Sequence, residues 1–258
     1  ADFLDCSFGF RPKRSAIDAA EVIRVAFPRG RKFVFEADIR NFFGSIDHDR
    51  LMGLVEERVS DRRVLKLVRG WLRAGVLDAG VRSETVTGTP QGGVISPLLA
   101  NVFLHAFDQA WAESGTGELV RYADDFVVLC STRSQAEQAQ RRATALLGEL
   151  GLELHPEKTT VVDLREGREG FDFLGWHFRA RMSGRLWEQR GVVRYYLHRW
   201  PSVRSMKRAR QRIKALTARS RVGIELETTI ESLNLFLRGW GNYFRTGNAA
   251  TKFVQVDR

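Results

Sequence analysis

The stretch VRYADDFVVLC, residues 120–130, decides the fold predicted for this sequence. Its two adjacent aspartates, Asp124 and Asp125, stand between apolar residues on both sides. Adjacent carboxylates repel each other, and a folded chain rarely places charge beside a buried run without a compensating partner. The pattern predicts a strand, a turn and a second strand. The acids are then either a solvated hairpin turn, where Asp is common, or one wall of a metal site.

A third acid strengthens the metal interpretation. The run KFVFEADI, residues 32–39, predicts a buried strand that closes with Asp38. If this strand neighbours the strands around Asp124 and Asp125 in one sheet, the three carboxylates converge at its edge. Carboxylates that close resist sharing a site unless a cation screens them, and their oxygens suit Mg²⁺. Two such ions can activate an attacking 3′-hydroxyl and stabilise a leaving pyrophosphate.

A second candidate feature is TGTPQGGVISPLLAN, residues 87–101. Its turn-forming first half is followed by an apolar helix pattern, with Ser96 as the candidate N-cap. The pair Gly92 and Gly93 would let a ligand approach the backbone closely, and Gln91 would present an amide to a nucleotide. An ordinary loop leading into a helix explains the same residues.

The composition indicates a globular protein with a polyanionic partner. Hydrophobic residues make up 43% of the 258 residues and charged residues 28%, and the net charge is +10 with a pI of about 10.2. Such a basic balance favours nucleic acid or an anionic membrane surface. The two cysteines have no ligand-like spacing, which argues against a zinc site or a disulfide framework. No apolar run is long enough to cross a bilayer.

Helical and strand patterns alternate along the chain, which predicts a mixed α+β body. We expect helices at residues 14–26, 47–59, 62–72, 96–111 and 134–150. We expect strands at residues 32–39, 158–164 and 171–178. Residues 189–224 then carry eleven Arg or Lys and no acid. Two helices are predicted in this last part, and their inward residues are expected to be Val203, Met206, Ala209, Ile213 and Leu216, then Leu226, Ile230, Leu233 and Leu237.

Six blocks in fixed order carry a family resemblance: FGFRPKRS (8–15), ADIRNFFGSIDHDRLM (37–52), TGTPQGGVISPLLAN (87–101), RYADDFVV (121–128), LGLELHPEKT (150–159) and FDFLGWHF (171–178). Together they resemble the reverse transcriptase encoded within bacterial group II introns. The basic segments PSVRSMKRARQRIKAL (201–216) and LNLFLRGWGNYFR (233–245) resemble the maturase-specific thumb of the same family. A lone YxDD is a weak signal, but six ordered blocks with a matching thumb are specific.

The resemblance implies a palm, an antiparallel sheet backed by helices, followed by an α-helical thumb. Residues 1–30 would be a remnant of the fingers region, 31–185 the palm, and 186–258 the basic maturase-specific thumb. The family normally has a longer fingers region ahead of FGFRP, and we expect this chain to lack it. No endonuclease pattern is visible after the thumb.

The implied function is RNA-directed DNA polymerisation, a nucleotidyl transfer onto a primer 3′-hydroxyl, together with intron RNA binding and splicing assistance. By similarity, Asp38, Asp124 and Asp125 would be the catalytic and metal-binding acids, with Asp125 the lesser contact. The cofactor would be two Mg²⁺ ions, with Mn²⁺ as an alternative. The expected partners are an RNA template, a DNA or RNA primer, dNTPs and structured intron RNA, with no membrane partner.

Five residues are expected to bind the incoming nucleotide or the primer end. Phe43 would lie under the sugar and exclude a 2′-hydroxyl, with Phe42 as the rival for this role and core packing as the alternative for both. Gln91 and Gly92 would line the nucleotide, and Ala123 the primer end. The guanidinium of Arg11, helped by Lys13 or Arg14, would hold the triphosphate. Lys13 stands where the family often has Gly, which weakens this expectation.

The remaining expected contacts are with nucleic acid. The segment FLGW, residues 173–176, would grip the primer backbone, with Gly175 at its turn. Phosphates of the template–primer duplex would be contacted by thumb cations in a salt-sensitive, sequence-independent manner; these are Arg204, Lys207, Arg208, Arg210 and Arg212. A solvated helix face is the alternative for any one of them.

Three other functions remain open at this level. The chain could be an RNA-binding maturase, or a repurposed host reverse transcriptase without independent polymerase activity, and a nucleotide cyclase on a similar palm would leave the basic thumb unexplained. The implied location is the bacterial cytoplasm, in association with the nucleoid or a ribonucleoprotein. The oligomeric state is not indicated.

Overall fold

The computed structural model describes residues 3–73, 77–78, 81–82, 93–221, 223 and 225–257. The chain forms two compact units, one of Ala1–Ala26 with Gly30–Val161 and the other of Phe27–Arg29 with Val162–Arg258. Among the described residues, no helix has the length and apolar character needed to cross a membrane. The domain boundaries expected near residues 30 and 185 follow the family likeness and stay a prediction.

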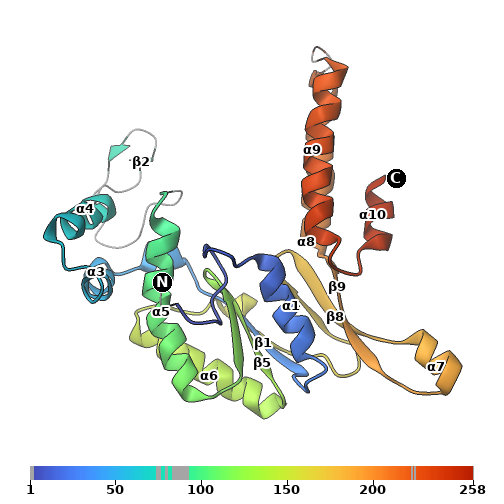
Figure 1. Cartoon of the computed structure of the whole chain (residues 1–258), viewed down its shortest axis with the longest axis horizontal. Coiled ribbons are helices and arrows are strands. Elements are labelled where there is room, and N and C mark those ends of the chain that lie inside the picture. Colours follow the sequence, from blue (N-terminus) through green and yellow to red (C-terminus); the bar gives the residue numbers. More distant parts are fainter. Residues whose placement is uncertain are drawn as a thin grey trace. The chain divides into compact units, whose positions relative to one another are not determined.

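The helices and strands follow the expected alternation (Figure 1). In the first unit they begin with α1 (Ala16–Ala26), β1 (Phe33–Asp38), α2 (Phe42–Ser45), α3 (His48–Glu56), α4 (Arg62–Arg73), β2 (Leu77–Asp78) and β3 (Val81–Arg82). They continue with α5 (Ser96–Ser114), β4 (Glu118–Tyr122), β5 (Asp125–Cys130), α6 (Arg133–Glu149), η1 (Pro156–Lys158) and β6 (Thr160–Asp163), and the second unit resumes within β6, at Val162.

The second unit continues after β6 with a small sheet and a set of helices. Its elements are β7 (Gly170–Phe173), β8 (Trp176–Met182), α7 (Gly184–Arg190), β9 (Tyr195–Pro201), α8 (Val203–Leu216), η2 (Arg219–Arg221), α9 (Leu226–Phe244) and α10 (Ala250–Asp257).

A four-stranded sheet in the order β4-β5-β1-β6 organises the first unit. Strand β5 pairs antiparallel with both β4 and β1. Helix α6 packs against β1 and β5, α1 packs against β4, and α5 contacts both α3 and α6. The residues of β5 after Asp125 are all buried, which fits a central strand covered on both faces.

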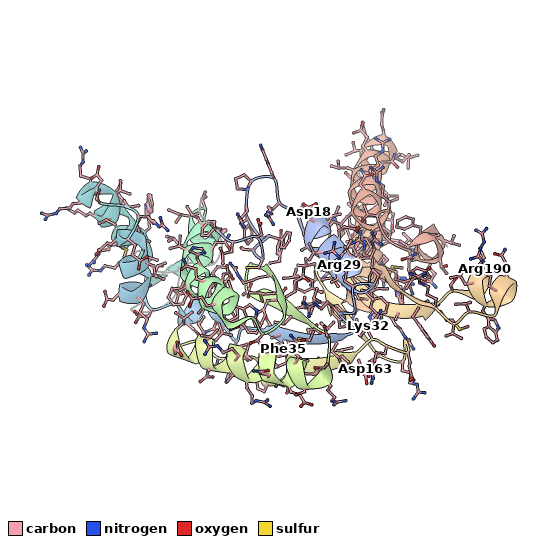
Figure 2. All side chains as sticks on the ribbon, turned by 60° about the horizontal axis from the view of Figure 1, so that its bottom comes forward. Asp18, Arg29, Lys32, Phe35, Asp163 and Arg190 are labelled. Atoms are coloured by element: carbon pink, nitrogen blue, oxygen red, sulfur yellow. The ribbon has the colours of Figure 1, made fainter. Side chains whose placement is uncertain are left out.

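Aromatic side chains join the sheet to its helices. Phe35 of β1 and Phe126 of β5 are fully buried, and their rings meet edge to face at 6.0 Å. Phe107 of α5 packs on Phe126 at 5.4 Å. Phe35 accordingly lies within the body of the unit, whereas Arg190 points outward from α7 (Figure 2). This packing makes the sheet a rigid support for the residues at its edge.

The second unit is built around the antiparallel sheet β7-β8-β9. Trp176 at the start of β8 is fully buried and packs on Tyr243 and Phe244 of α9 at 5.5 and 4.7 Å. Helices α8 and α9 pack together, and α10 packs against α8 (Figure 1). The short helix α7 connects the far ends of β8 and β9 (Figure 1).

The predicted α+β class, with a sheet backed by helices and then a helical part, is confirmed. Two local predictions about the second unit were wrong. FDFLGWHF is not one strand but a hairpin, because Leu174 and Gly175 adopt positive φ of 52° and 78° and reverse the chain. Val203, Leu226 and Ile230 are 84%, 74% and 48% exposed rather than inward, although Met206, Ala209 and Leu216 are buried as expected.

Candidate active site

The three acids meet at one end of neighbouring strands. Tyr122 of β4 stands opposite Asp125 of β5, so Ala123 and Asp124 form a two-residue turn. On the other side of β5, Asp38 at the end of β1 stands opposite Asp125 in the register. Side chains directly opposite on paired strands have Cβ atoms about 4.5–5.5 Å apart. The predicted convergence of strands therefore exists, and it brings Asp38 beside Asp125 with Asp124 in the adjoining turn.

The electrostatics of these acids reflect their crowding. Burial is the main cause that raises the pKa of Asp124, and the negative charge of Asp38 adds to it. Burial, the charges of Asp124 and Asp38, and a hydrogen bond with Asp38 raise the pKa of Asp125 to about 6. The side chain of Asp125 is surrounded by protein groups yet still reaches water, since more than a third of the residue is exposed.

One of the three acids, Asp38, is paired with a lysine of the chain. The Lys158 ammonium, at the end of η1, forms an ion pair with the carboxylate of Asp38. The backbone supports this pairing, because the His155 N–H donates to the Asp38 carbonyl at 2.8 Å and Ile39 bridges to Leu154. Lys158 was not among the predicted site residues, although it lies in the LGLELHPEKT block.

The three acids are candidate ligands for a divalent cation by their chemistry but not yet by their spacing. Among the described residues, no group of three or more His, Cys, Asp and Glu side chains is close enough to hold a metal ion as it stands. The donor chemistry nevertheless fits, because burial and the neighbouring carboxylates both raise the pKa of Asp124 and Asp125, and a hard cation would stabilise their charged forms. We therefore treat Asp38, Asp124 and Asp125 as candidate ligands.

The turn that carries Asp124 is backed by the N-terminal loop. The Phe8 N–H donates to the Arg121 carbonyl at 2.8 Å, and the Arg121 N–H donates to the Cys6 carbonyl at 2.8 Å. Gly9 lies so close to the turn that a Cβ there would stand 2.6 Å from the nitrogen of Ala123. Ala123 itself adopts φ of 57°, a left-handed conformation that a side chain disfavours. The FGFRP block is thus in part a support for the YADD turn.

A buried polar network holds the same turn from beneath. Arg121 and Asp108 are fully buried, and the Arg121 guanidinium donates two hydrogen bonds to Asp108, at 2.7 and 2.5 Å. It also donates to the Ala123 carbonyl at 2.9 Å, to Asn101 Oδ1 at 3.2 Å and to Ser7 Oγ at 2.9 Å. This network was missed in the sequence, although Asn101 and Asp108 are polar positions in an otherwise apolar helix pattern.

Comparison with known proteins was made against this geometry. The model of the family "Reverse transcriptase (RNA-dependent DNA polymerase)" matches residues 2–178. The chain belongs to the reverse transcriptase family. The model "Group II intron, maturase-specific domain" matches residues 206–258, so this reverse transcriptase also carries a maturase-specific domain. The resemblance to reverse transcriptases of group II introns is confirmed.

Two curated relatives agree with this assignment. Protein YkfC of Escherichia coli K12 is 32% identical over 231 residues, which cover 74% of this chain and 59% of that protein. Group II intron-encoded protein LtrA of Lactococcus lactis is 44% identical over 107 residues, 42% of this chain and 18% of that protein. The alignments thus span less than two thirds of either relative.

The solved structures show the same fold at low identity. Telomerase from Candida albicans, in complex with a TWJ fragment of telomeric RNA, matches with a TM-score of 0.55 and 17% identity. The match covers 97% of this chain and 44% of the telomerase chain. The reverse transcriptase and maturase domains together support RNA binding by the protein.

The predicted nucleotide-binding residues lie in different settings. Phe42 is 2% exposed and part of the core, while Phe43 packs against it at 5.3 Å and remains partly exposed. Of the two, Phe43 is the one that a sugar could reach, and its role stays a prediction. Gln91 and Gly92 lie outside the described residues. Helix α5 begins at Ser96 with Ile95 in the cap position, so Ser96 is not the N-cap.

The predicted triphosphate contacts centre on a loop that Arg11 itself stabilises. Its guanidinium donates to the carbonyls of Phe3, Leu4 and Ser7, at 2.9, 2.6 and 2.7 Å. A contact between Arg11 and a triphosphate stays a prediction. Lys13 adopts φ of 60°, a left-handed conformation that favours glycine.

The FLGW turn is tied to the helices that follow it. The Gly175 carbonyl accepts from Ser205 Oγ at 2.8 Å and from the Ser202 N–H at 2.9 Å. The Leu174 carbonyl accepts from the Tyr243 hydroxyl at 2.8 Å. A Cβ on Gly175 would stand 2.9 Å from Ser205 Oγ, so the turn fits closely against α8. Its contact with a primer backbone stays a prediction.

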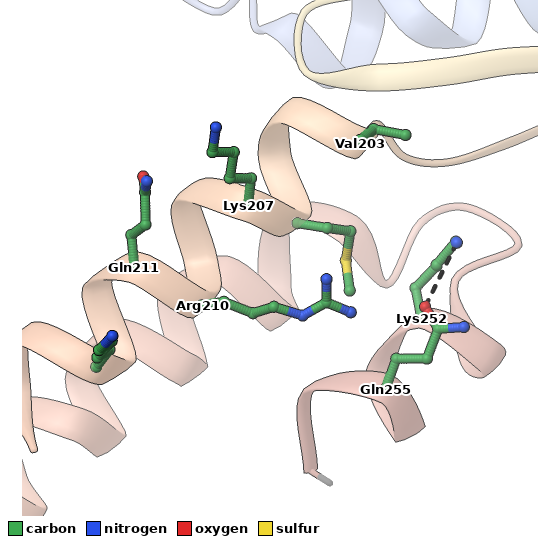
Figure 3. Close-up of a pocket in the computed structure, with 8 residues that line it drawn as sticks. Val203, Lys207, Arg210, Gln211, Lys252 and Gln255 are labelled. Carbon is green, nitrogen blue, oxygen red and sulfur yellow. Dashed lines mark hydrogen bonds between the residues drawn. The ribbon is translucent and has the colours of Figure 1, made fainter.

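All five predicted cations of α8 are exposed, and they divide between two faces. Arg204, Arg208 and Arg212 follow one another at i, i+4 spacing on one line of the helix. Lys207 and Arg210 instead line a groove of about 480 Å³ between α8 and α10. Figure 3 shows Arg210 reaching toward α10, where Lys252 donates to Gln255 Oε1 at 3.4 Å. Duplex binding by these residues stays a prediction.

Proposed function

We propose that this reverse transcriptase copies RNA into DNA with Asp38, Asp124 and Asp125 as its catalytic acids. The observation that carries the proposal is the strand register, which sets Asp38 opposite Asp125 and places Asp124 in the adjoining two-residue turn. A pure RNA-binding protein has no use for such crowded acids, since their repulsion destabilises the fold.

The position of each residue in the site suggests its role in the proposed reaction. Asp38 and Asp124 would be the principal ligands of two divalent cations, Mg²⁺ or Mn²⁺, and Asp125 the weaker one. When bound, such ions would activate the primer 3′-hydroxyl and neutralise charge on the triphosphate. Lys158 would neutralise Asp38 whenever the site holds no cation. Phe43, backed by the buried Phe42, would support the sugar of the incoming deoxynucleotide.

We further propose that the protein is of group II intron type, binding structured intron RNA and assisting its splicing. The support is the maturase-specific domain at residues 206–258 and the exposed cations of α8, which face solvent without an acidic partner among the described ion pairs. Cations of this kind bind phosphates without regard to sequence, and the binding weakens as salt rises.

The test is primer extension on an RNA template with Mg²⁺, using the full-length protein and its Asp124→Asn variant. Extension should fall below detection in the variant, while binding of the template–primer stays within about twofold, a difference of roughly 0.4 kcal/mol. Asp49→Asn, at an exposed position of α3, is the matched control and should extend normally. Extension by the Asp124→Asn protein at the parental rate would show that these acids are not catalytic.

The rival function, an RNA-binding maturase without polymerase activity, is favoured by one observation, the match to the maturase-specific domain. Splicing assistance measured with Asp124→Asn separates the two activities. We expect splicing assistance to persist in this variant, because the acids and the α8 cations lie on different elements. Splicing that persists in a parental protein unable to extend any primer would favour the rival.

A further inference from the structure

One face of the β8–β9 hairpin carries rings and cations in alternation. In β9, Tyr196, His198 and Trp200 fall at every second residue, and the residues between them, Leu197 and Arg199, are buried. Side chains at i, i+2 and i+4 of a strand point to the same face. The three rings therefore form a line on the outer face, which we call the ring row.

The neighbouring strand places cations and a further ring against this row. Across the register, Arg181 stands opposite Tyr196, Arg179 opposite His198, and His177 opposite Trp200. The Arg181 guanidinium lies over the Trp200 ring at 4.9 Å, and the His177 ring is 5.1 Å from it. At the open end, Arg194 lies over Tyr196 at 5.4 Å.

The ring row is accessible, and positively charged arginines lie beside it. Tyr196 is 42% exposed, and His198 and Trp200 are partly exposed. From Trp176 to Pro201 the sequence contains six arginines and one acid, Glu188. On β7, the carboxylate of Asp172 is engaged by His177 Nδ1 at 2.6 Å. Burial, with the charge of Arg181, lowers the pKa of His198, which favours the uncharged form of this ring.

The distance between neighbouring rings of the ring row matches the length of one nucleotide in an extended single strand. Alternate residues of a strand are about 7 Å apart, a distance that a stretched single strand covers in one nucleotide. Exposed rings on a sheet stack with unpaired bases, whereas the bases of a duplex present their faces only to one another. Arginines beside the rings can at the same time neutralise phosphates.

We propose that the ring row, with Arg181 and Arg194 beside it, binds an unpaired stretch of RNA through base stacking. This surface differs from the α8 cations proposed to contact a duplex, and from the FLGW turn proposed to grip the primer. The proposal rests on RNA as the ligand of this protein and not on polymerase chemistry. Surface packing alone would also account for the contact of Arg181 with Trp200, and the experiment separates the two explanations.

The experiment measures RNA affinity in the full-length protein by fluorescence anisotropy, in the Asp124→Asn background so that no extension occurs. The probe is a labelled, unstructured single-stranded RNA of roughly 12 nucleotides, and a duplex RNA of equal length is measured beside it. Tyr196→Ala and Trp200→Ala should each weaken single-strand binding about 5-fold to 100-fold. The affinity for duplex should change less than about twofold.

Conservative and control variants identify the cause. Tyr196→Phe and Trp200→Phe keep a ring and should retain most of the single-strand affinity. Trp187→Ala removes a ring that is more exposed, at 52% against 42% for Tyr196, but lies on α7 and off the sheet face, and it should have no effect. Thermal unfolding checks that each variant folds. If Trp200→Ala does not fold, Tyr196→Ala, at the more exposed ring, decides the outcome.

Two results would overturn the proposal. One is single-strand affinity of folded Tyr196→Ala within about twofold of its parent, which would leave the rings with a packing role only. The other is an equal loss on duplex and single-stranded RNA, which would show that unpaired bases are not what this face binds. Neither result bears on the catalytic acids, because primer extension by the parental protein is measured separately.

Discussion

The buried pair of Arg121 and Asp108 offers the sharpest test of how the YADD turn is held in place. Replacing Arg121 with Met keeps most of the side-chain volume and removes every donor. The Asp108 carboxylate, which is fully buried, would then lose both of its hydrogen bonds from the guanidinium. Asn101 Oδ1, Ser7 Oγ and the Ala123 carbonyl would each lose a donor as well.

The magnitude follows from what remains buried after the substitution. Removing one partner of a buried ion pair costs about 3–5 kcal/mol, because the other charge is left without compensation. The three lost neutral bonds act in the same direction. We therefore expect Arg121→Met to lower the free energy of unfolding by at least about 3 kcal/mol, measured by urea denaturation with the slope compared between variants.

A second variant separates charge from position. Replacing both partners, as Arg121→Met with Asp108→Leu, removes the uncompensated charge and should restore much of the lost stability. It should not restore primer extension, because the Ala123 carbonyl still lacks the donor that fixes the turn. A loss below about 1 kcal/mol in the single variant would refute the reasoning, since it would mean that Asp108 finds another partner or water.

Three further outcomes are expected from substitutions near the acids. Lys13→Gly should raise the free energy of unfolding by about 1 kcal/mol, because φ of 60° strains any residue with a Cβ; no gain in urea denaturation would contradict this. Gly9→Ala should lower the free energy of unfolding by about 1–3 kcal/mol, because the added Cβ would press on the Ala123 nitrogen. The control is Gly53→Ala in α3, where an added Cβ meets nothing within 4 Å and should leave the free energy of unfolding unchanged or raise it. Asp125→Asn should stabilise the metal-free protein at pH 7.5 by on the order of 1 kcal/mol after solvent screening, and much less at pH 4. The folded-state pKa of Asp125 is about 6, above the usual 3.8, so the destabilisation caused by its charge grows as pH rises through that range. If the variant and its parent, measured in EDTA, differ by the same free energy of unfolding at both pH values, this prediction is wrong.

The elements around the acids could be predicted because their signals are local. The alternation and length of 32–39 and 120–130 indicate strands, and Asp124–Asp125 interrupts the apolar run where a turn is needed. The pairing of Asp38 with Asp125 could not be read from these patterns, because it joins residues far apart in the chain. The family resemblance supplied that information, not the periodicity.

The supports of the site were harder to predict than the site. Asn101 and Asp108 stand seven residues apart on one face of α5, and a polar pair on a buried face signals an unseen partner. That signal was available, but it could not identify Arg121 or Ser7 as the partner. The FLGW segment was misjudged for another reason: its Gly was taken as part of a strand, although Gly inside a strand pattern often marks a reversal.

The acids of the site differ in whether a cation of the chain is paired with them. The buried Arg121 donates to the Ala123 carbonyl of the turn, but its charge is matched by Asp108. Lys158 matches Asp38. Among the described ion pairs, neither Asp124 nor Asp125 has a cation of its own, and burial, together with the neighbouring carboxylates, raises the pKa of each.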